Sequence, residues 1–194
     1  MESIINLEGQ SLYNISNELL DKIKNNNSLT ELNLNNTSIE NINRLCDILK
    51  KNKSIRTLNL GENDINNFDK LCDVLKVNKT LKTLILNFNM NFTDFFDKLC
   101  DALKINSSLN VLYLEGNRIQ NIDKLYDVLK INKSLQELYL GWNNFKYDED
   151  KLNDCLKINK TLKVLCLNID ENYLNMKSIY KIYFHEFQNI LNLD

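Results

Sequence analysis

A seven-residue segment with three inward-facing apolar places returns six times along the chain, at intervals of 26 to 28 residues. The copies read SLTELNL, SIRTLNL, TLKTLIL, SLNVLYL, SLQELYL and TLKVLCL, and they begin at residues 28, 54, 80, 108, 134 and 161. A self-similar period of this length is typical of repeat architectures, in which each unit contacts only its neighbours. The repeat therefore constrains the fold more than composition does, and it predicts a solenoid.

Each repeat contains two different apolar spacings. In LxxLxL, the apolar residues at places one, four and six point inward around a short strand and the bend that follows it. The block that comes next, for example KLCDVLKVNK, has apolar residues three and four positions apart, which is helix spacing. Neither element can bury its apolar face alone, so the units must stack. We predict an α/β solenoid with about six or seven parallel strands, most of them backed by a helix.

At the longer pattern LxxLxLxxN the chain resembles leucine-rich repeats. The run LCDVLKVNKTLKTLILNFN at 71–89 is similar to the ribonuclease-inhibitor-like subclass, which includes the sensor repeats of NOD-like receptors. The repeat length is also similar to that of the cysteine-containing subclass, whose cysteine positions this chain does not share. The resemblance implies a curved solenoid, with a parallel sheet on the concave side and helices on the convex side.

The resemblance also implies a ladder of asparagines, each of which satisfies buried backbone groups in the turn after its strand. Two rungs depart from the pattern, Thr37 and Asp170, and we expect them to lie in edge repeats with less buried backbone. The predicted ladder residues are Asn63, Asn89, Asn117 and Asn143.

A second set of asparagines follows the helical blocks, each just after a last turn that contains lysine. Asparagine tolerates the left-handed conformation that ends many helices, so we expect these residues to end the helices in that conformation. We interpret the N-x-S/T triplets that several of them form as part of the repeat. The set is Asn52, Asn78, Asn106, Asn132 and Asn159.

The repeat boundaries predict a single domain with modified ends. Residues 28–170 hold the leucine-rich repeats, and residues 1–27 form a degenerate first repeat or cap. Residues 171–194 lose the pattern but keep helical spacing, which predicts a helical C-terminal cap. The repeat at 80–107 is two residues longer than its neighbours, and we expect residues 90–93 to bulge at the rim where strands pass into helices.

Composition and charge favour a protein without an active site. The formal net charge is -2, and no apolar run approaches membrane-spanning length. One histidine, 4 glycines and no phosphate-binding glycine loop offer nothing on which to build catalysis. We therefore predict a non-enzyme that needs no cofactor and binds a protein, with no nucleic acid and no membrane involved.

The cysteines indicate packing and a reducing compartment. Cys46, Cys72 and Cys100 occupy one helix place in successive repeats. Zinc needs four close ligands, and neighbouring helices lie too far apart for disulfides, so we interpret these residues as small side chains between helices and predict no metal site. The odd count of 5 cysteines and an N-terminus unlike a secretory signal predict a cytoplasmic location.

The helical blocks also repeat the pattern Arg/Lys-x-x-Asp-x-x-Lys, for example Lys70, Asp73 and Lys76. Residues three apart on a helix are neighbours, so we expect solvated ion pairs within each helix, worth roughly a few tenths of a kcal/mol each. Their role would be helix support and solubility.

The variable strand positions place aromatic side chains toward one end of the predicted concave face. The place between the last two apolar residues of the motif changes from asparagine in the first repeats to isoleucine and tyrosine later. The place two residues beyond the motif holds a phenylalanine and the single tryptophan. Rings held on a rigid sheet dominate interface hot spots, so we expect them exposed on the concave side. The predicted partner-binding residues are Ile85, Phe88, Tyr113, Glu137, Tyr139 and Trp142.

Three functions fit this pattern. The leading hypothesis is a protein–protein interaction module that binds a partner through the concave face. Proteins of the resembled fold include activators of Ran-type GTPases and enzyme inhibitors, so regulation of an enzyme is an alternative, with Asn117 and Arg118 as the candidate activator residues. The third is homo-oligomeric assembly, for example a homodimer formed through the aromatic end.

Overall fold

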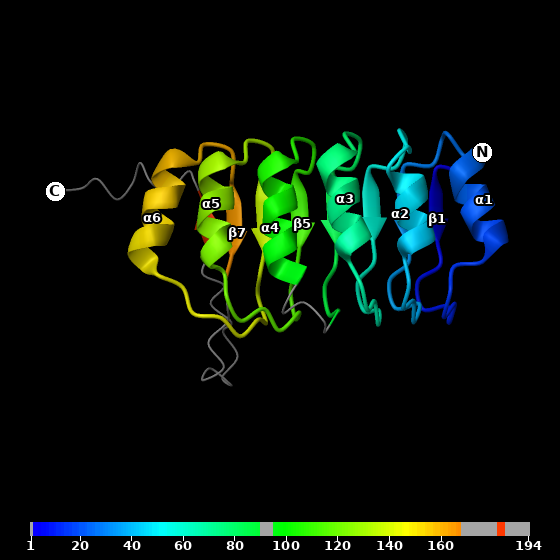
Figure 1. The fold of residues 1–194 in the computed structure, drawn as a ribbon, viewed down its shortest axis with the longest axis horizontal. Coiled ribbons are helices and arrows are strands. Elements are labelled where there is room, and N and C mark those ends of the chain that lie inside the picture. The colour runs from blue at the N-terminus through cyan, green and yellow to red at the C-terminus, as the bar shows by residue number, and fades with distance from the viewer. Residues whose placement is uncertain (1, 90–94, 168–181, 185–194) are drawn as a thin grey trace.

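The computed structural model describes residues 2–89, 95–167 and 182–184, and these form one layer of strands backed by one layer of helices (Figure 1). Seven parallel strands alternate along the chain with six helices among these residues. Each repeat contributes one strand and one helix, as the two apolar spacings require. The predicted fold class, an α/β leucine-rich-repeat solenoid with an open parallel sheet, is confirmed.

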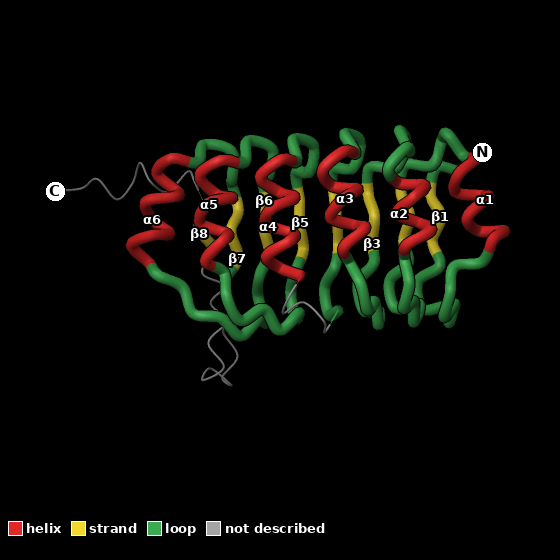
Figure 2. The backbone as a smooth tube through the Cα atoms, viewed as in Figure 1, coloured by secondary structure: helices red, strands yellow, loops and turns green. Residues whose placement is uncertain are grey.

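The strands are short and pair in chain order. Equivalent places face each other in every parallel pair, such as Leu58 with Leu84 and Tyr113 with Tyr139. Residues at one place of the repeat therefore form columns across the sheet, whose strands are yellow in Figure 2. The parallel strands are β1 (Ile4–Asn6), β2 (Glu31–Asn33), β3 (Thr57–Asn59), β4 (Thr83–Ile85), β5 (Val111–Tyr113), β6 (Glu137–Tyr139) and β7 (Val164–Cys166).

The helices lie side by side behind the sheet (Figure 2). Their apolar side chains are part of the core between the two layers. Asp69 and Asp123 each begin a helix, where a negative charge meets the positive end of the helix dipole. The helices are α1 (Asn17–Asn25), α2 (Asn43–Leu49), α3 (Asp69–Val77), α4 (Phe95–Ile105), α5 (Asp123–Ile131) and α6 (Glu149–Ile158).

The core runs between the two layers, and the cysteines lie in it. The central leucines of the strands are buried, and so are Cys46, Cys72 and Cys100 on the helices. Burial raises the pKa of the Cys46 and Cys72 thiols to about 12, and it also raises the pKa of Cys100. Neutral buried thiols behave as small apolar side chains, which agrees with a packing role between helices.

The asparagines that follow the helices do not adopt the left-handed conformation expected of them. Asn78, Asn132 and Asn159 have extended backbones, with φ of -70°, -65° and -73°. Their side chains instead join adjacent repeats. In Asn132, for example, Nδ2 donates to the Leu103 carbonyl at 2.7 Å while Oδ1 accepts from the Leu135 amide at 2.7 Å. The expectation was wrong because it gave asparagine the role that glycine has at the end of many helices. Here the position needs the amide side chain, which bonds to two adjacent repeats.

This second ladder continues through the repeats. Asn78 donates to Leu49 O, and Asn106 donates to Leu75 O. Asn159 donates to Leu129 O, and all of these asparagines are at least 95% buried. We define the row as the helix-to-strand ladder, as distinct from the strand-to-helix ladder predicted from the resemblance. It explains why the N-x-S/T triplets recur with the repeat. Its members are Asn78, Asn106, Asn132 and Asn159.

Ion pairs on the convex face run between helices as well as within them. Lys76 and Asp73 of α3 pair at 3.7 Å, as expected for residues three apart. Shorter contacts join neighbouring helices, such as Lys70 with Asp47 at 3.2 Å and Lys104 with Asp127 at 3.2 Å. The sequence pattern hid these pairs because their partners lie about one repeat away.

The two ends of the solenoid differ from the inner repeats. Residues 2–27 supply β1 and α1, with Ile5, Leu20 and Ile23 buried. At the other end, β8 (Ile182–Phe184) pairs antiparallel with β7, so for these three residues the structure has a strand where the spacing predicts a helix. The rest of the expected cap, Asp170 and the expected bulge at 90–93 lie outside the described residues. None of the described helices is long and apolar enough to cross a membrane.

Candidate protein-binding surface

The turn after each strand is held by the strand-to-helix ladder. Asn117 Nδ2 donates to Leu86 O of the preceding repeat at 3.0 Å, and its Oδ1 accepts from the Asn89 amide at 2.7 Å. Asn143 does the same one repeat later, donating to Leu114 O and accepting from the Asn117 amide. The side chains of Asn63, Asn89 and Asn117 are at most 4% exposed. Each turn is therefore fixed by hydrogen bonds within and between repeats.

Two rungs of this ladder differ from the rest. Thr37 was expected to face less buried backbone, but it is fully buried, and its hydroxyl donates to Leu34 O at 2.7 Å. The Thr37 hydroxyl thus makes one of the donations of an asparagine side chain, since Asn63 donates to Leu60 O at the same place of its own repeat. Asn89 donates to Leu60 O and Leu86 O, while its Oδ1 has no partner among the described residues.

The residue before each ladder residue has a left-handed backbone, which directs its side chain away from the core. Glycine and asparagine adopt this conformation easily, whereas it strains a bulky residue. Nevertheless, two repeats place large rings there, Phe88 with φ of 54° and Trp142 with φ of 57°. The column of left-handed residues is Gly9, Asn36, Glu62, Phe88, Gly116 and Trp142.

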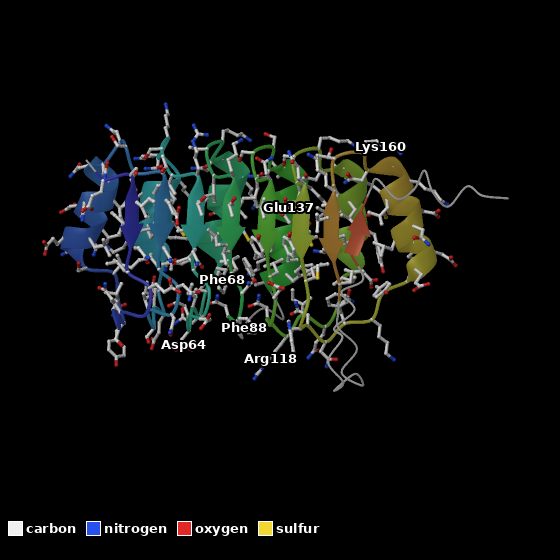
Figure 3. All side chains as sticks on the ribbon, turned by 180° about the vertical axis from the view of Figure 1, so that it is seen from behind. Asp64, Phe68, Phe88, Arg118, Glu137 and Lys160 are labelled. Carbon is white, nitrogen blue, oxygen red and sulfur yellow. The ribbon has the colours of Figure 1, made fainter. Side chains whose placement is uncertain are left out.

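These two rings lie at the rim where strands pass into helices, next to the concave sheet. Trp142 is 62% exposed and Phe88 is 46% exposed. A Cβ atom added at Gly116 would collide with the Phe88 ring, so that ring occupies the space which Gly116 leaves open. Figure 3 shows Phe88 and Arg118 together along this rim. The expected exposure of Trp142 holds, but its ring and that of Phe88 project from turns and not from the sheet itself.

Tyr113 and Tyr139 lie on the concave sheet and are less exposed than expected. The rings stack with their centroids 4.4 Å apart and an interplanar angle of 5°. Both tyrosines are only partly exposed, because each ring covers a face of the other. The parallel register places Tyr113 opposite Tyr139. The motif alone did not predict that their rings would stack.

Glu137 lies beside this stack on β6 (Figure 3). The Tyr139 hydroxyl donates to Glu137 Oε2 at 2.9 Å. Burial, the hydrogen bond to Glu137 and the negative charge of that residue raise the pKa of Tyr139 above its usual range. At neutral pH Tyr139 is therefore neutral and donates to the Glu137 carboxylate. This hydrogen bond fixes the orientation of the ring.

Two polar residues complete this half of the face, and sequence reasoning had not grouped them. Asn87 Nδ2 donates to Glu115 Oε2 at 3.0 Å, and Asn87 Oδ1 accepts from the Glu115 amide at 2.9 Å. Burial raises the pKa of Glu115. Ile85 precedes Tyr113 and Tyr139 in the same column and is also partly exposed. Asn87 and Glu115 each follow the last leucine of their motif, and this shared position in the repeat could have predicted that they are neighbours.

The N-terminal half of the same face is polar. Asn33 Nδ2 donates to Glu8 Oε2 at 3.2 Å, and Asn35 Nδ2 lies 3.4 Å from Glu62 Oε1. Asn59 Oδ1 accepts from the Gly61 amide. The amides and carboxylates of these strands therefore bond to groups within and between repeats. One exposed ring, Tyr13, lies in this half, in the segment between β1 and α1 and not on the sheet.

Nothing in the described residues gathers three or more His, Cys, Asp or Glu side chains in a way that could hold a metal ion. The arrangement on the concave face and rim consists instead of apolar rings, amides and a few carboxylates. Such groups bind by contact area and hydrogen bonding.

The fold is shared with proteins of known structure. No family model matches the chain, and no curated protein matches its sequence. Among solved structures, actin-binding site 2 of leiomodin-1 is similar, with a TM-score of 0.61 and 22% identity over 77% of this chain and 90% of that chain. The tropomodulin C-terminal domain of Caenorhabditis elegans has a TM-score of 0.52 and 12% identity over 81% of this chain and 83% of that one. These similarities place the chain in the class of leucine-rich-repeat-like solenoids.

Proposed function

We propose that the protein is a non-enzymatic recognition module that binds a partner protein through the C-terminal half of its concave face and the adjoining rim. We define the aromatic surface as the residues of this region that would contact the partner. The observation that carries the proposal is the exposure of two bulky rings from strained, left-handed turns beside a stacked tyrosine pair. The aromatic surface comprises Ile85, Phe88, Tyr113, Glu137, Tyr139 and Trp142.

The physics of the aromatic surface supports this role. The turns that carry Phe88 and Trp142 are held by buried asparagines, so the rings need little ordering when a partner binds. Tyr113 and Tyr139 are already fixed by their stack. An asparagine or glycine would fit these turns without backbone strain, so the retention of bulky rings there supports a functional role for the rings. Exposed aromatic area also reduces solubility unless a partner covers it.

The comparisons support a protein partner in general terms. Leiomodin-1 site 2 is an actin-binding site, and it shares this fold over most of its length. We therefore propose actin as the first partner to test, in both filamentous and monomeric forms. We also propose that the protein acts in the cytoplasm, that its repeats are of the ribonuclease-inhibitor-like subclass, and that residues 28–170 are the repeat array.

Affinity capture with matched variants tests the proposal. The double variant Tyr139→Ala/Trp142→Ala should lose partner capture from native cell extract while it stays folded, with a melting temperature lowered by only a few degrees through loss of the tyrosine stack. The control Asn33→Ala/Asn59→Ala alters the polar half of the same face and should keep capture. Purified actin provides a defined ligand for the same comparison. Equal capture by both double variants would move the binding site elsewhere.

The regulator alternative has one supporting observation. Arg118 is exposed at the rim, with φ of 57°, directly after the ladder residue Asn117. Figure 3 shows its side chain extending outward beyond the turn. If the protein activates a GTPase, Arg118→Ala should abolish stimulated GTP hydrolysis without loss of binding. For the homo-oligomer alternative, light scattering should detect a dimer that Trp142→Ala disrupts.

A further inference from the structure

A row of exposed aliphatic side chains follows the ends of four consecutive helices. Each is the last residue of its helix and is more than half exposed, at 52–58%. The repeat does not need an apolar residue here, because Lys51 occupies the equivalent place after α2 and is also exposed. Four such residues in successive repeats therefore form a surface feature beyond the core. They are Val77, Ile105, Ile131 and Ile158.

The loops around this row are strongly basic. Five segments run from the helix ends to the strands, at 50–56, 76–82, 104–110, 130–136 and 157–163. They contain no aspartate or glutamate and hold more than half of the chain's 24 lysines and arginines. We define this side as the upper edge, which Figure 3 marks by Lys160. Its basic residues are Lys50, Lys51, Lys53, Arg56, Lys76, Lys79, Lys82, Lys104, Lys130, Lys133, Lys157, Lys160 and Lys163.

Helix physics explains only part of this composition. Cations in a last turn interact favourably with the helix dipole, which accounts for Lys76, Lys104 and Lys157. Lys79 and Lys160 lie beyond their helices, and Lys79 contacts only the Ser107 hydroxyl among the described groups. The dipole gives no reason for exposed isoleucines. Some of its lysines lie in last helical turns and pair with aspartates of the helices, such as Lys76 with Asp73 and Lys104 with Asp127. Lys79 and Lys160 form no ion pair among the described residues, and the net charge of -2 conceals them because it is summed over the whole chain.

The chemistry of the upper edge favours one kind of partner. Neighbouring helix axes lie roughly 8–10 Å apart, so the aliphatic side chains stand singly and form no continuous groove for a peptide. Twelve of its basic residues are lysines, which are depleted at protein–protein interfaces, where arginine and aromatic rings are enriched. Nucleic acid would favour arginine and stacking rings. Single aliphatic residues among lysines suit a fluid surface with anionic phosphates.

We propose that the upper edge docks on an anionic phospholipid bilayer. The helix ends lie along one side of the molecule, so a flat surface can meet all of them together (Figure 1). The four aliphatic side chains of the row enter the boundary between headgroups and acyl chains, and the lysines bind the headgroup phosphates. This inference does not depend on the proposed function, because the aromatic surface lies on the concave face and the opposite rim. It departs from the expectation that no membrane is involved, which rested on the lack of an apolar run of membrane-spanning length.

Vesicle sedimentation tests the proposal with the full chain. Wild type should sediment with phosphatidylcholine vesicles that contain phosphatidylserine and not with phosphatidylcholine alone, and salt should weaken the binding. Each basic residue near such a surface raises affinity by roughly fivefold, so Lys79→Glu/Lys160→Glu should lower affinity more than about tenfold. The matched control Arg118→Glu/Lys146→Glu changes net charge equally at the opposite rim and should bind nearly as wild type. Equal losses in the two double variants would overturn the proposal.

The aliphatic row is tested separately from the charge. Replacing Val77, Ile105, Ile131 and Ile158 together with serine should weaken vesicle binding at least about fivefold while retention on immobilised polyglutamate stays unchanged. Because these side chains are exposed, circular dichroism should show an unaltered fold. The control Ile4→Ser removes an exposed isoleucine from β1. Retention on polyglutamate without any vesicle binding by wild type would mean an acidic protein partner and would refute membrane docking.

Discussion

The two halves of the concave sheet share one scaffold and present different surfaces. Strands β2 and β3 place Asn33 and Asn59 in the same column where β5 and β6 place Tyr113 and Tyr139. Backbone pairing and buried leucines are equivalent in both halves. The polar side bonds to itself through amides and carboxylates, whereas the aromatic side stacks and projects rings at the rim. The difference teaches that the repeated residues fix the fold and the variable residues define the binding surface.

The largest expected effect is common to both halves. Asn63→Ala and Asn117→Ala should each lower the free energy of unfolding by ~1–3 kcal/mol, because each leaves buried backbone groups of two repeats unpaired. Asn89→Ala should cost less, because Asn89 Oδ1 already lacks a partner among the described residues. Urea denaturation measures the effect, with the exposed Asn144→Ala as control. If only one of the Asn63→Ala and Asn117→Ala variants loses stability, the two halves do not share one scaffold.

The helix-to-strand ladder should matter nearly as much. Asn132→Ala removes donations to Leu103 O and Asn106 O and the acceptor for two backbone amides, so we expect a loss of ~1–2 kcal/mol. Asn132→Gly would test the alternative of a left-handed helix end and should be equally harmful. A glycine variant that melts like wild type would show that backbone conformation, and not the amide, is what the position requires.

A smaller effect should separate the two halves directly. In a double-mutant cycle, Tyr113→Ala and Tyr139→Ala should show a coupling energy of ~0.5–1.5 kcal/mol from their stacked rings. The equivalent cycle for Asn33→Ala and Asn59→Ala should give a value close to zero. These residues face each other in register, but their side chains bond to Glu8 and to the Gly61 amide and not to each other. Equal coupling in the two cycles would remove the distinction between the halves.

The smallest effect concerns alkaline pH. The pKa of Tyr139 is raised in the folded state, so the neutral phenol is favoured there. Its contribution to stability is complete below the unfolded pKa of about 10 and is lost as pH rises through the folded pKa. Tyr139→Phe should therefore reduce the loss of stability above about pH 10, measured by thermal melts across that range. The exposed Tyr13→Phe serves as control, and an identical alkaline profile for both variants would contradict this account.

Much of the fold followed from the sequence, because a repeat forces its own stacking. LxxLxL and the helical block predicted the strand–helix order, the parallel sheet and the buried faces. The asparagines of the LxxLxLxxN pattern lie where that resemblance implies, with their amides bonded to turn backbone. What the sequence could not supply was contact between repeats. The helix-to-strand ladder and the Lys70–Asp47 pair both depend on groups brought together by stacking.

The candidate site was less predictable for a related reason. The motif predicted which residues lie outside the core, but it did not predict whether each of them lies on a strand or on the turn after it. Phe88 and Trp142 were expected on the concave face, and the left-handed turns direct them along its rim. Tyr113 and Tyr139 were expected to be well exposed, and register stacks them instead. The net charge does not reveal the upper edge, because it combines lysines and carboxylates from every position of the repeat.

The fluorescence of Trp142, the only tryptophan in the chain, tests the central claim most directly. Because Trp142 is 62% exposed, acrylamide should quench its emission readily in the free protein. Saturation with the captured partner, or with actin if actin binds, should shift the emission to shorter wavelength and protect it from quenching. The Asn33→Ala/Asn59→Ala variant should behave in the same way. A bound complex in which Trp142 remains as accessible as in the free chain would contradict binding through the aromatic surface.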